Sequence, residues 1–368
     1  MDRTTYIARR QKVADTMRQH GGGIAVLPTA PERTRNRDSL HPYRHDSYFH
    51  YLSGFGEPDG WLAIDEQGRT TLFCRARDPE REIWDGVRLG PEAAPAELGV
   101  DQAFPVEALD EQMPRLLANQ GAVWFPFGVH EGLEARIEGW LATVRSRERQ
   151  GQEPPRALLD LCHVLDEMRL VKDAAELATM RRAAAISAGA HVRAMQQSAR
   201  WLRSAFERSW YEYHLEAELL HEFRRHGAQS PAYPSIVAAG ANACILHYPA
   251  GNAELRPGQL CLIDAGCELD GYASDITRTF PLDGRFTAPQ RELYDIVLAA
   301  QEAAIAATRP GARQRDAHHA AVRVLSQGLL DTGLLDADRH GSVDDVIERA
   351  AYRQFYMHGT GHWLGMDV

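Results

Sequence analysis

The stretch LCLIDAGCELDGYASDITRTF, residues Leu260–Phe280, determines the fold of the second half of the chain. An apolar run leads into Asp264, and Asp270-Gly271 is a pair typical of a two-residue β-hairpin turn. With that pair in the turn, Gly266 on the first strand lies opposite Asp275 on the second. Because side chains alternate along strands, Asp264 and Asp275 then share one face as diagonal neighbours, about 7–8 Å apart at the backbone. The sequence therefore predicts a hairpin that carries two neighbouring carboxylates.

Two carboxylates on one face of an apolar-flanked hairpin are unfavourable, because like charges repel and burial disfavours ionisation. Cations relieve both effects, and oxygen ligands at this spacing suit two divalent metals about 3.5–4 Å apart. The alternative is an ordinary hairpin whose aspartates are solvated or paired with Arg278. The spacing by itself leaves both interpretations open.

A second cluster, His358-Gly359-Thr360-Gly361-His362, places two histidines four residues apart. Residues at this spacing share a face in a helix or in a strand, and the two glycines argue against a helix. No glutamate follows His358, so this is not the HExxH zinc-protease helix. Single histidines are often structural, whereas a glycine-flanked pair favours a functional role.

A third piece is Asn242–Tyr248, which contains His247. Taken alone, this histidine is interpreted as a polar residue of a strand. The glycines and prolines before it, over residues 228–240, indicate irregular chain, where substrate contacts often lie.

Composition restricts the classes of protein that the chain can represent. Of its 368 residues, 44% are hydrophobic and 25% charged, which is ordinary for a soluble globular protein. The net charge of −10 argues against a general nucleic-acid binder, although Arg33, Arg35, Arg37 and Arg44 lie in one loop. No apolar run is long enough to span a membrane, and no signal peptide is visible. The five scattered cysteines predict reduced thiols in a cytoplasmic protein.

The length predicts two domains, with residues 1–170 as the first and 171–368 as the second. In the first, short apolar runs predict strands that alternate with helices, the pattern of an α/β domain. The predicted strands are 24–27, 60–64, 71–74 and 122–125, the helices 5–20, 106–119 and 130–146, and the loop 147–156. The second domain is predicted to open with a helix that starts at 173, followed by another over 210–226.

Together these pieces closely resemble the Xaa-Pro aminopeptidases (aminopeptidase P), which are pita-bread metallopeptidases. The motifs that carry the resemblance in the second half are Ser235–Val237, Ile245–Tyr248, Leu262–Gly266, Asp275–Pro281 and His358–Val368. Those in the first half are Tyr43–Phe55 and Ile83–Gly86. The resemblance implies an α/β N-terminal domain followed by an α+β pita-bread domain of the creatinase/aminopeptidase type.

The resemblance also implies an activity, the release of the N-terminal residue from peptides with proline at the second position. Two divalent ions, manganese before zinc or cobalt, would be held by Asp264, Asp275 and His362, with Asp275 bridging. A hydroxide bridging the metals would attack the peptide carbonyl before proline. His247 and His358 would line the substrate site and assist proton transfer.

Two further residues are implied to support the site. Tyr233 is similar to a tyrosine that supports the bridging aspartate, and Trp84 to a tryptophan that reaches into a neighbouring subunit's site. A homo-tetramer is therefore expected, with a peptide as substrate and with neither nucleic acid nor membrane as partner.

The sequence departs from the family pattern at its end. Family members continue past the final Asp-Val with another histidine, two glutamate ligands and an arginine, whereas this sequence ends at Val368 in an apolar, strand-like stretch. We therefore expect an incomplete pita-bread domain that binds metal poorly and catalyses little. Two alternatives remain: a prolidase, which demands a dipeptide, and a non-catalytic pita-bread scaffold that binds peptides or proteins.

Overall fold

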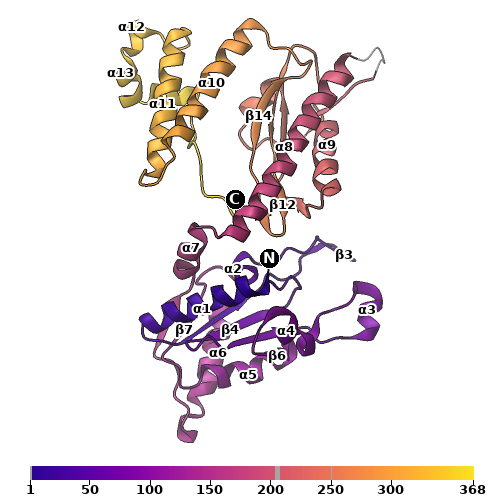
Figure 1. Cartoon of the computed structure of the whole chain (residues 1–368), viewed down its shortest axis with the longest axis vertical. Helices are drawn as coiled ribbons and strands as arrows, with labels where there is room; N and C mark the ends of the chain where they lie inside the picture. Colours follow the sequence, from indigo (N-terminus) through magenta and orange to yellow (C-terminus); the bar gives the residue numbers. More distant parts are fainter. Residues whose placement is uncertain (1, 204–207, 250) are drawn as a thin grey trace. The chain divides into compact units, whose positions relative to one another are not determined.

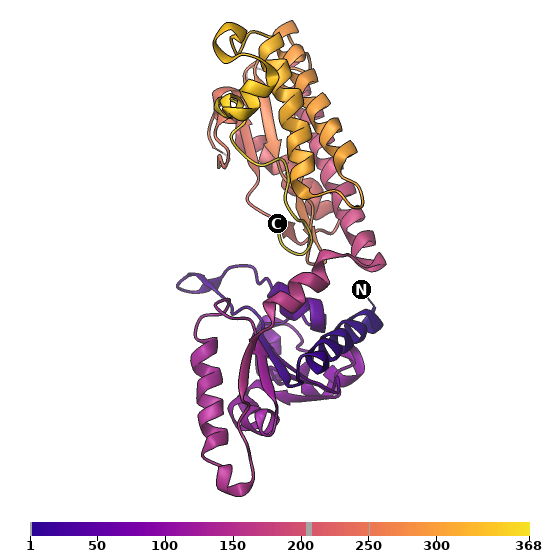
Figure 2. The same ribbon diagram turned by 90° about the vertical axis from the view of Figure 1, so that its left-hand side faces the viewer.

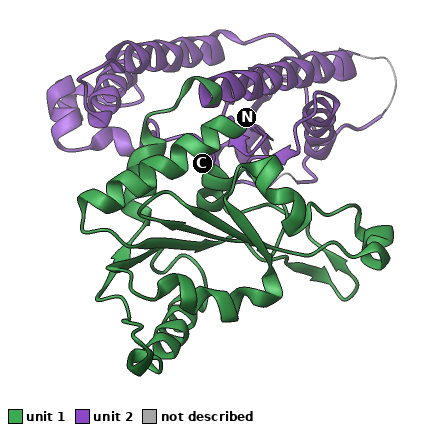
Figure 3. Ribbon diagram, turned by 60° about the horizontal axis from the view of Figure 1, so that its bottom comes forward, with its two compact units in different colours: residues 1–175 green, residues 176–368 purple. Residues whose placement is uncertain are grey.

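The computed structural model describes residues 2–203, 208–249 and 251–368, and the chain divides into two compact units, Met1–Ala175 and Glu176–Val368 (Figure 3). The division lies inside a helix that begins at Ala174. The predicted domain boundary, between residues 170 and 171, lies five residues earlier in the chain. Among the described helices, none combines the length and apolar character that a membrane span requires.

Unit 1 is built on a six-stranded mixed sheet with the order β6-β5-β4-β1-β7-β8. Its strands are β1 (Ile24–Pro28), β4 (Trp61–Asp65), β5 (Thr70–Cys74), β6 (Gln102–Pro105), β7 (Ala122–Phe125) and β8 (Ala157–Asp160). The four predicted strands are confirmed as β1, β4, β5 and β7, which occupy the middle of the sheet. The two edge strands, β6 and β8, were missed; unlike the central strands, they bury none of their residues.

Helices cover both faces of this sheet. Figure 1 shows α1 on one face and α5 and α6 on the other, where they bury apolar side chains against β1, β5 and β7. The helices of unit 1 are α1 (Arg3–Gln19), α2 (Ser47–Ser53), α3 (Pro79–Asp85), α4 (Gly90–Leu98), α5 (Leu109–Leu117), α6 (Leu133–Arg145) and α7 (Cys162–Leu170). Two short 3-10 helices, η1 (Val106–Ala108) and η2 (Glu148–Gln150), and a small hairpin of β2 (Thr34–Asn36) and β3 (Ser39–Leu40) complete it.

The predicted helices 5–20, 106–119 and 130–146 are confirmed as α1, η1 with α5, and α6. The predicted loop 147–156 is irregular apart from η2.

Unit 2 begins with the long helix α8, and its two small antiparallel sheets have the orders β10-β11-β14 and β13-β12-β9. Its strands are β9 (Ser230–Pro231), β10 (Ile236–Ala239), β11 (Leu260–Asp264), β12 (Cys267–Leu269), β13 (Tyr272–Ala273) and β14 (Thr277–Pro281). Its helices are α8 (Ala174–Arg203), α9 (Glu212–Arg225), η3 (Gly240–Cys244), α10 (Ala288–Ala307), α11 (Gln314–Asp331), α12 (Ala337–His340), α13 (Val343–Glu348) and η4 (Ala351–Gln354).

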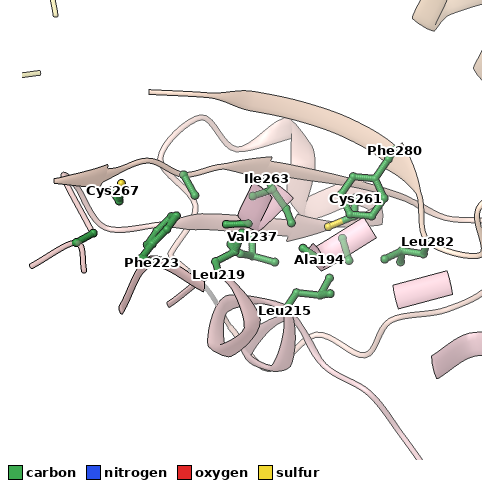
Figure 4. Close-up of a cluster of buried hydrophobic side chains, with 14 of the residues drawn as sticks. Ala194, Leu215, Leu219, Phe223, Val237, Cys261, Ile263, Cys267, Phe280 and Leu282 are labelled. Carbon is green, nitrogen blue, oxygen red and sulfur yellow. The ribbon is translucent and has the colours of Figure 1, made fainter. Parts of the chain in front are cut away.

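One hydrophobic core joins α8 and α9 to both sheets of unit 2 (Figure 4). Leu215, Leu219 and Phe223 recur on α9 at the spacing of one helix face and point toward the strands. Val237 of β10 and Ile263 of β11 meet them with no exposed surface. The helices predicted at 173 and over 210–226 are therefore the packing elements that support the sheets.

The last third of unit 2 is helical. Helices α10 and α11 lie side by side, as the views in Figures 1 and 2 agree, and Ala300, Ala304 and Ala321 form a small core between them. Small side chains at these positions allow the two helices to approach closely. α11, α13 and η4 share a second small core around Val346 and Tyr352.

The stretch Trp363–Val368 is irregular, so its prediction as a strand is wrong. A backbone hydrogen bond from Ala273 N to Gly365 O, 2.8 Å long, joins this stretch to a neighbouring strand. The stretch is not assigned as a strand, although Met366 is buried.

Candidate active site

The predicted hairpin is confirmed in its register. Leu269 pairs with Tyr272 across the turn, and further along Asp264 pairs with Thr277 in the same register. Asp270 and Gly271 have φ angles of 51° and 79°, the left-handed pair that a tight hairpin turn needs. The register thus places Asp264 diagonally opposite Asp275, as the sequence predicted.

The hairpin is interrupted between its two halves, at residues 265–266 and 274–276. A buried group of hydroxyls holds this interruption: Ser187 Oγ of α8 lies 2.8 Å from Ser274 Oγ, and both accept from Cys267 N. Gly266 permits the close approach, since a Cβ atom there would lie 1.6 Å from Ser274 O. The interruption is where the chain leaves one small sheet for the other.

Tyr233 joins the two carboxylates. Its hydroxyl oxygen lies 2.6 Å from Asp264 Oδ1 and 2.9 Å from Asp275 Oδ1. A hydroxyl carries one proton, so it can donate to only one carboxylate at a time. The two carboxylates therefore share the proton of this hydroxyl, and their like charges face each other across it.

The surroundings shift the titration of these groups. Burial raises the pKa of Asp264, the hydrogen bond from Tyr233 lowers it, and the charge of Asp275 raises it again. Burial and both carboxylates raise the pKa of Tyr233, so its hydroxyl stays protonated. A cation near the carboxylates would relieve their repulsion and favour their charged forms.

His362 lies against the same pair. Its Nε2 atom is 3.1 Å from Asp275 Oδ2, and its Nδ1 atom is 2.8 Å from Trp363 O. Both partners are oxygen atoms, so the imidazole ring is oriented by a carboxylate on one side and a backbone carbonyl on the other. Nε2 is the ring nitrogen that faces the carboxylates, so it is the one placed to bind a cation together with Asp275.

These residues fit a divalent cation in their chemistry, because carboxylate oxygens and an imidazole nitrogen are ligands for manganese-type and zinc-type ions. Within residues 2–203, 208–249 and 251–368, however, no three His, Cys, Asp or Glu side chains are already gathered as a metal-binding group. Arg278 donates to Thr277 O, and no ion pair in the described part of the chain joins it to either aspartate. The alternative of an arginine-paired hairpin therefore finds no support.

The structure brings together Asp264, Asp275, His362 and Tyr233. His247 is exposed in a turn that follows η3, so its interpretation as a strand residue is wrong. Residues 244–247 are all exposed and lack a strand partner among the described residues.

His358 is exposed and its ring meets that of Tyr356 edge-on, with centroids 4.8 Å apart. The segment between His358 and His362 is held by α11, because His318 Nδ1 lies 2.8 Å from Thr360 Oγ1. Trp84 lies in α3 of unit 1 with 84% of its surface exposed.

Sequence reasoning missed the polar groups that support this site from other elements. Ser187 lies in the middle of α8, and its role depends on contact with Ser274, 87 residues away. Glu212, at the start of α9, is fully buried and accepts three hydrogen bonds. A fully buried glutamate is unusual, but no local pattern shows that it is buried.

The structure predicts the effect of removing the shared hydroxyl. In Tyr233→Phe, Asp264 loses the hydrogen bond that lowers its pKa, so that pKa should rise further. Loss of such a supporting group typically weakens metal binding about ten- to a hundredfold. The Mn²⁺ concentration that half-broadens NMR signals near Asp275 measures this, with Tyr294→Phe on α10 as the matched control. An unchanged concentration in Tyr233→Phe would contradict the role of the hydroxyl.

Comparisons with known proteins agree with this organisation. Residues 178–368 match metallopeptidase family M24, and residues 6–124 match the aminopeptidase P N-terminal domain. The chain is 42% identical to the Xaa-Pro aminopeptidase of Escherichia coli over 100% of its own length and 81% of the relative's. It is 43% identical to the Xaa-Pro aminopeptidase of Haemophilus influenzae, over 98% of the chain and 79% of that protein.

Two solved structures extend the comparison. Aminopeptidase PepP of Pseudomonas aeruginosa superposes with a TM-score of 0.92 at 47% identity, covering 100% of this chain and 81% of that one. A zinc-substituted E. coli aminopeptidase P in complex with product superposes with a TM-score of 0.92 at 42% identity, with the same coverage of both chains.

An α/β domain followed by a domain with paired carboxylates on an antiparallel hairpin defines a pita-bread metallopeptidase, and the expected fold class is confirmed. Such enzymes hydrolyse peptide bonds with the help of divalent cations. Within this class, the chain belongs to the Xaa-Pro aminopeptidases of family M24.

Proposed function

We propose that this chain releases the N-terminal residue from peptides with proline at the second position, and that Asp264, Asp275 and His362 hold two divalent cations for this reaction. The observation that carries the proposal is the pair of carboxylates joined by Tyr233 and contacted by His362. When bound, the cations supply a nucleophile from water near neutral pH and polarise the peptide carbonyl. We propose manganese as the first choice, with zinc or cobalt as substitutes.

The chain's own residues have separate tasks in this proposal. Tyr233 fixes the orientation of the two carboxylates through its hydroxyl. His247 and His358, both exposed, are free to face a bound peptide and to exchange protons with its amide and its amino terminus. Family membership supports these assignments.

We also propose that Trp84 contributes to a neighbouring copy of the chain in a homo-tetramer. Ile83, Trp84 and Val87 in and after α3 are 82%, 84% and 78% exposed, an unusual density of large apolar side chains in contact with water. Burial against a second copy would remove this surface from solvent.

We place the protein in the cytoplasm. Its five cysteines are all free, which matches a reducing compartment.

The substrate preference is tested with three peptides in excess Mn²⁺: Ala-Pro-Ala, Ala-Pro and Ala-Ala-Ala. We expect alanine to be released from Ala-Pro-Ala, slower release from the dipeptide, and none from the peptide without proline. Asp275→Asn is the inactive control, because it removes the charge of the bridging carboxylate. Cleavage confined to Ala-Pro would indicate a prolidase instead, and peptide binding without any cleavage would indicate a scaffold.

Metal binding is expected to be weak. Each divalent cation takes four or more ligands, whereas Asp264, Asp275 and His362 offer three side chains for two cations. A calorimetric titration with Mn²⁺ should therefore not saturate at stoichiometric metal, and Asp264→Asn should abolish the remaining heat. Two tight sites in the unmodified chain would contradict this expectation.

A further inference from the structure

Glu212 is a carboxylate with no exposed surface at the first residue of α9. Buried charges are normally paired with opposite charges, yet the hydrogen-bond partners of Glu212 are neutral donors. Its Oε1 accepts from Ala239 N at 2.8 Å and from Asn242 Nδ2 at 3.0 Å, and its Oε2 accepts from Tyr248 Oη at 2.9 Å. One carboxylate thus accepts hydrogen bonds from a backbone amide, a side-chain amide and a phenol.

These donors all belong to one short segment, residues 239–248, which carries His247 (the His247 loop). Ala239 ends β10, Asn242 lies in η3, and Tyr248 directly follows His247. Asn242 Nδ2 also lies 3.0 Å from Tyr248 Oη, so the three side chains form a closed triangle. Glu212 therefore contacts the His247 loop at its start, in η3, and directly after the turn that presents the histidine.

The chain that leaves the loop is fixed to the same place. Glu212 N donates to Ala253 O at 3.0 Å, and Leu255 N donates to Trp210 O at 2.7 Å. A Cβ atom on Gly251 would lie 2.6 Å from Tyr248 Oη and 3.3 Å from Glu212 Oε2, so the backbone passes directly beside the triangle. Both ends of the loop are thus joined to the start of α9.

Apolar packing does not hold the His247 loop. Ile245 and Leu246 are 53% and 52% exposed, and Cys244 and His247 are exposed as well. With so little buried apolar surface, the conformation of the loop depends on its hydrogen bonds, and those of Glu212 lie at its centre.

We propose that Glu212 is the positioning residue for His247: it fixes the loop so that the imidazole meets the bound peptide. This role rests on the proposed function, because it gives His247 a task in the hydrolysis. Glu212 itself does not touch the substrate in this proposal. A small displacement of a group that handles the reacting peptide lowers the rate strongly, by up to about a hundredfold for 1 Å.

The test compares four variants with the unmodified chain. Glu212→Ala removes the acceptor, and Glu212→Gln keeps its size but directs an amide at Tyr248 Oη, which already accepts from Asn242. Tyr248→Phe removes the phenol hydroxyl, and with it the bond to Glu212 and the bond from Asn242, and leaves the carboxylate in place. Glu216→Gln is the matched control, since it makes the same change one turn along α9, and no contact found among the described residues joins Glu216 to the loop.

The first readout is backbone amide hydrogen exchange over residues 239–249, which needs neither metal nor activity. We expect exchange at least about tenfold faster in Glu212→Ala, intermediate rates in Glu212→Gln and Tyr248→Phe, and no change in Glu216→Gln. If Glu212→Ala does not fold, the two milder variants decide. Unchanged exchange in both would overturn the anchoring role.

The second readout is hydrolysis of Ala-Pro-Ala with Mn²⁺, separated into kcat and KM. A positioning residue predicts that kcat falls about ten- to a hundredfold in Glu212→Ala, with KM within about threefold and partial recovery in Glu212→Gln. A loosened loop with unchanged kcat would overturn the proposal. If the unmodified chain cleaves no Xaa-Pro peptide, the proposed function fails and the positioning role with it, while the exchange data still show whether Glu212 anchors the loop.

Discussion

Gly266→Ala should unfold or severely destabilise unit 2. The added Cβ would lie 1.6 Å from Ser274 O and 2.4 Å from Ser274 C, and both are backbone atoms that cannot move without opening the hairpin. Overpacking of well-packed sites costs about 1–3 kcal/mol, and a clash with the backbone of the facing strand belongs above that range. We expect a loss of more than about 3 kcal/mol in the free energy of unfolding.

The same substitution at Gly189 is the control. Gly189 lies within α8, and its nearest neighbour to a new Cβ is Glu222 Oε1 at an ordinary 3.9 Å. Alanine is the better helix former, so Gly189→Ala should stabilise unit 2 by about 0.5–1 kcal/mol. Urea unfolding of both variants measures the difference. Equal midpoints for the two would show that the hairpin tolerates a side chain at Gly266.

Acid should destabilise unit 1 through His45 and His50. Their rings stack with centroids 3.7 Å apart, and His45 Nδ1 is buried without a hydrogen-bond partner among the described residues. Burial lowers the pKa of His45 to about 3 and that of His50 to about 4. Both rings therefore stay neutral in the folded chain at pH 5, whereas the unfolded chain takes up protons below about pH 6.5.

The sign follows from this proton balance: the unfolded state binds more protons, so stability falls as the pH decreases from about 6.5. At pH 5 each ring accounts for about 2 kcal/mol, because one pKa unit corresponds to about 1.4 kcal/mol, and the two together for about 4 kcal/mol. Urea unfolding at pH 7.5 and pH 5 measures the loss. In the double variant His45→Gln, His50→Phe the loss should be smaller by about that amount. An equal loss in both proteins would refute the assignment.

The hairpin could be predicted from sequence because local signals decide it. The Asp270-Gly271 turn fixes the register, and alternation then fixes which side of the strand Asp264 and Asp275 occupy. The central strands of unit 1 were predictable for a similar reason, since each is a short apolar run. The edge strands β6 and β8 were not predictable in this way. None of their residues is buried, so only their pairing with a neighbouring strand identifies them.

The supporting groups of the site could not be predicted in this way. Ser187 meets Ser274 across 87 residues, and Glu212 meets Tyr248 across 36. Such contacts arise only when α8 and α9 pack on the sheets. The segment around His247 was predicted wrongly for the opposite reason. Its residues Ile245 and Leu246 have the composition of a strand but lack a partner strand among the described residues.

The interruption of the hairpin has a mechanical consequence. β11 belongs to one small sheet and β12 to the other, and the chain passes between them at Gly266 and Ser274, beside the two acids. The separation of Asp264 and Asp275 is therefore set by the relative orientation of two sheets, which one shared core holds together. A substitution in that core that tilts one sheet against the other would change the distance between the carboxylates, even where the substituted residue lies far from them.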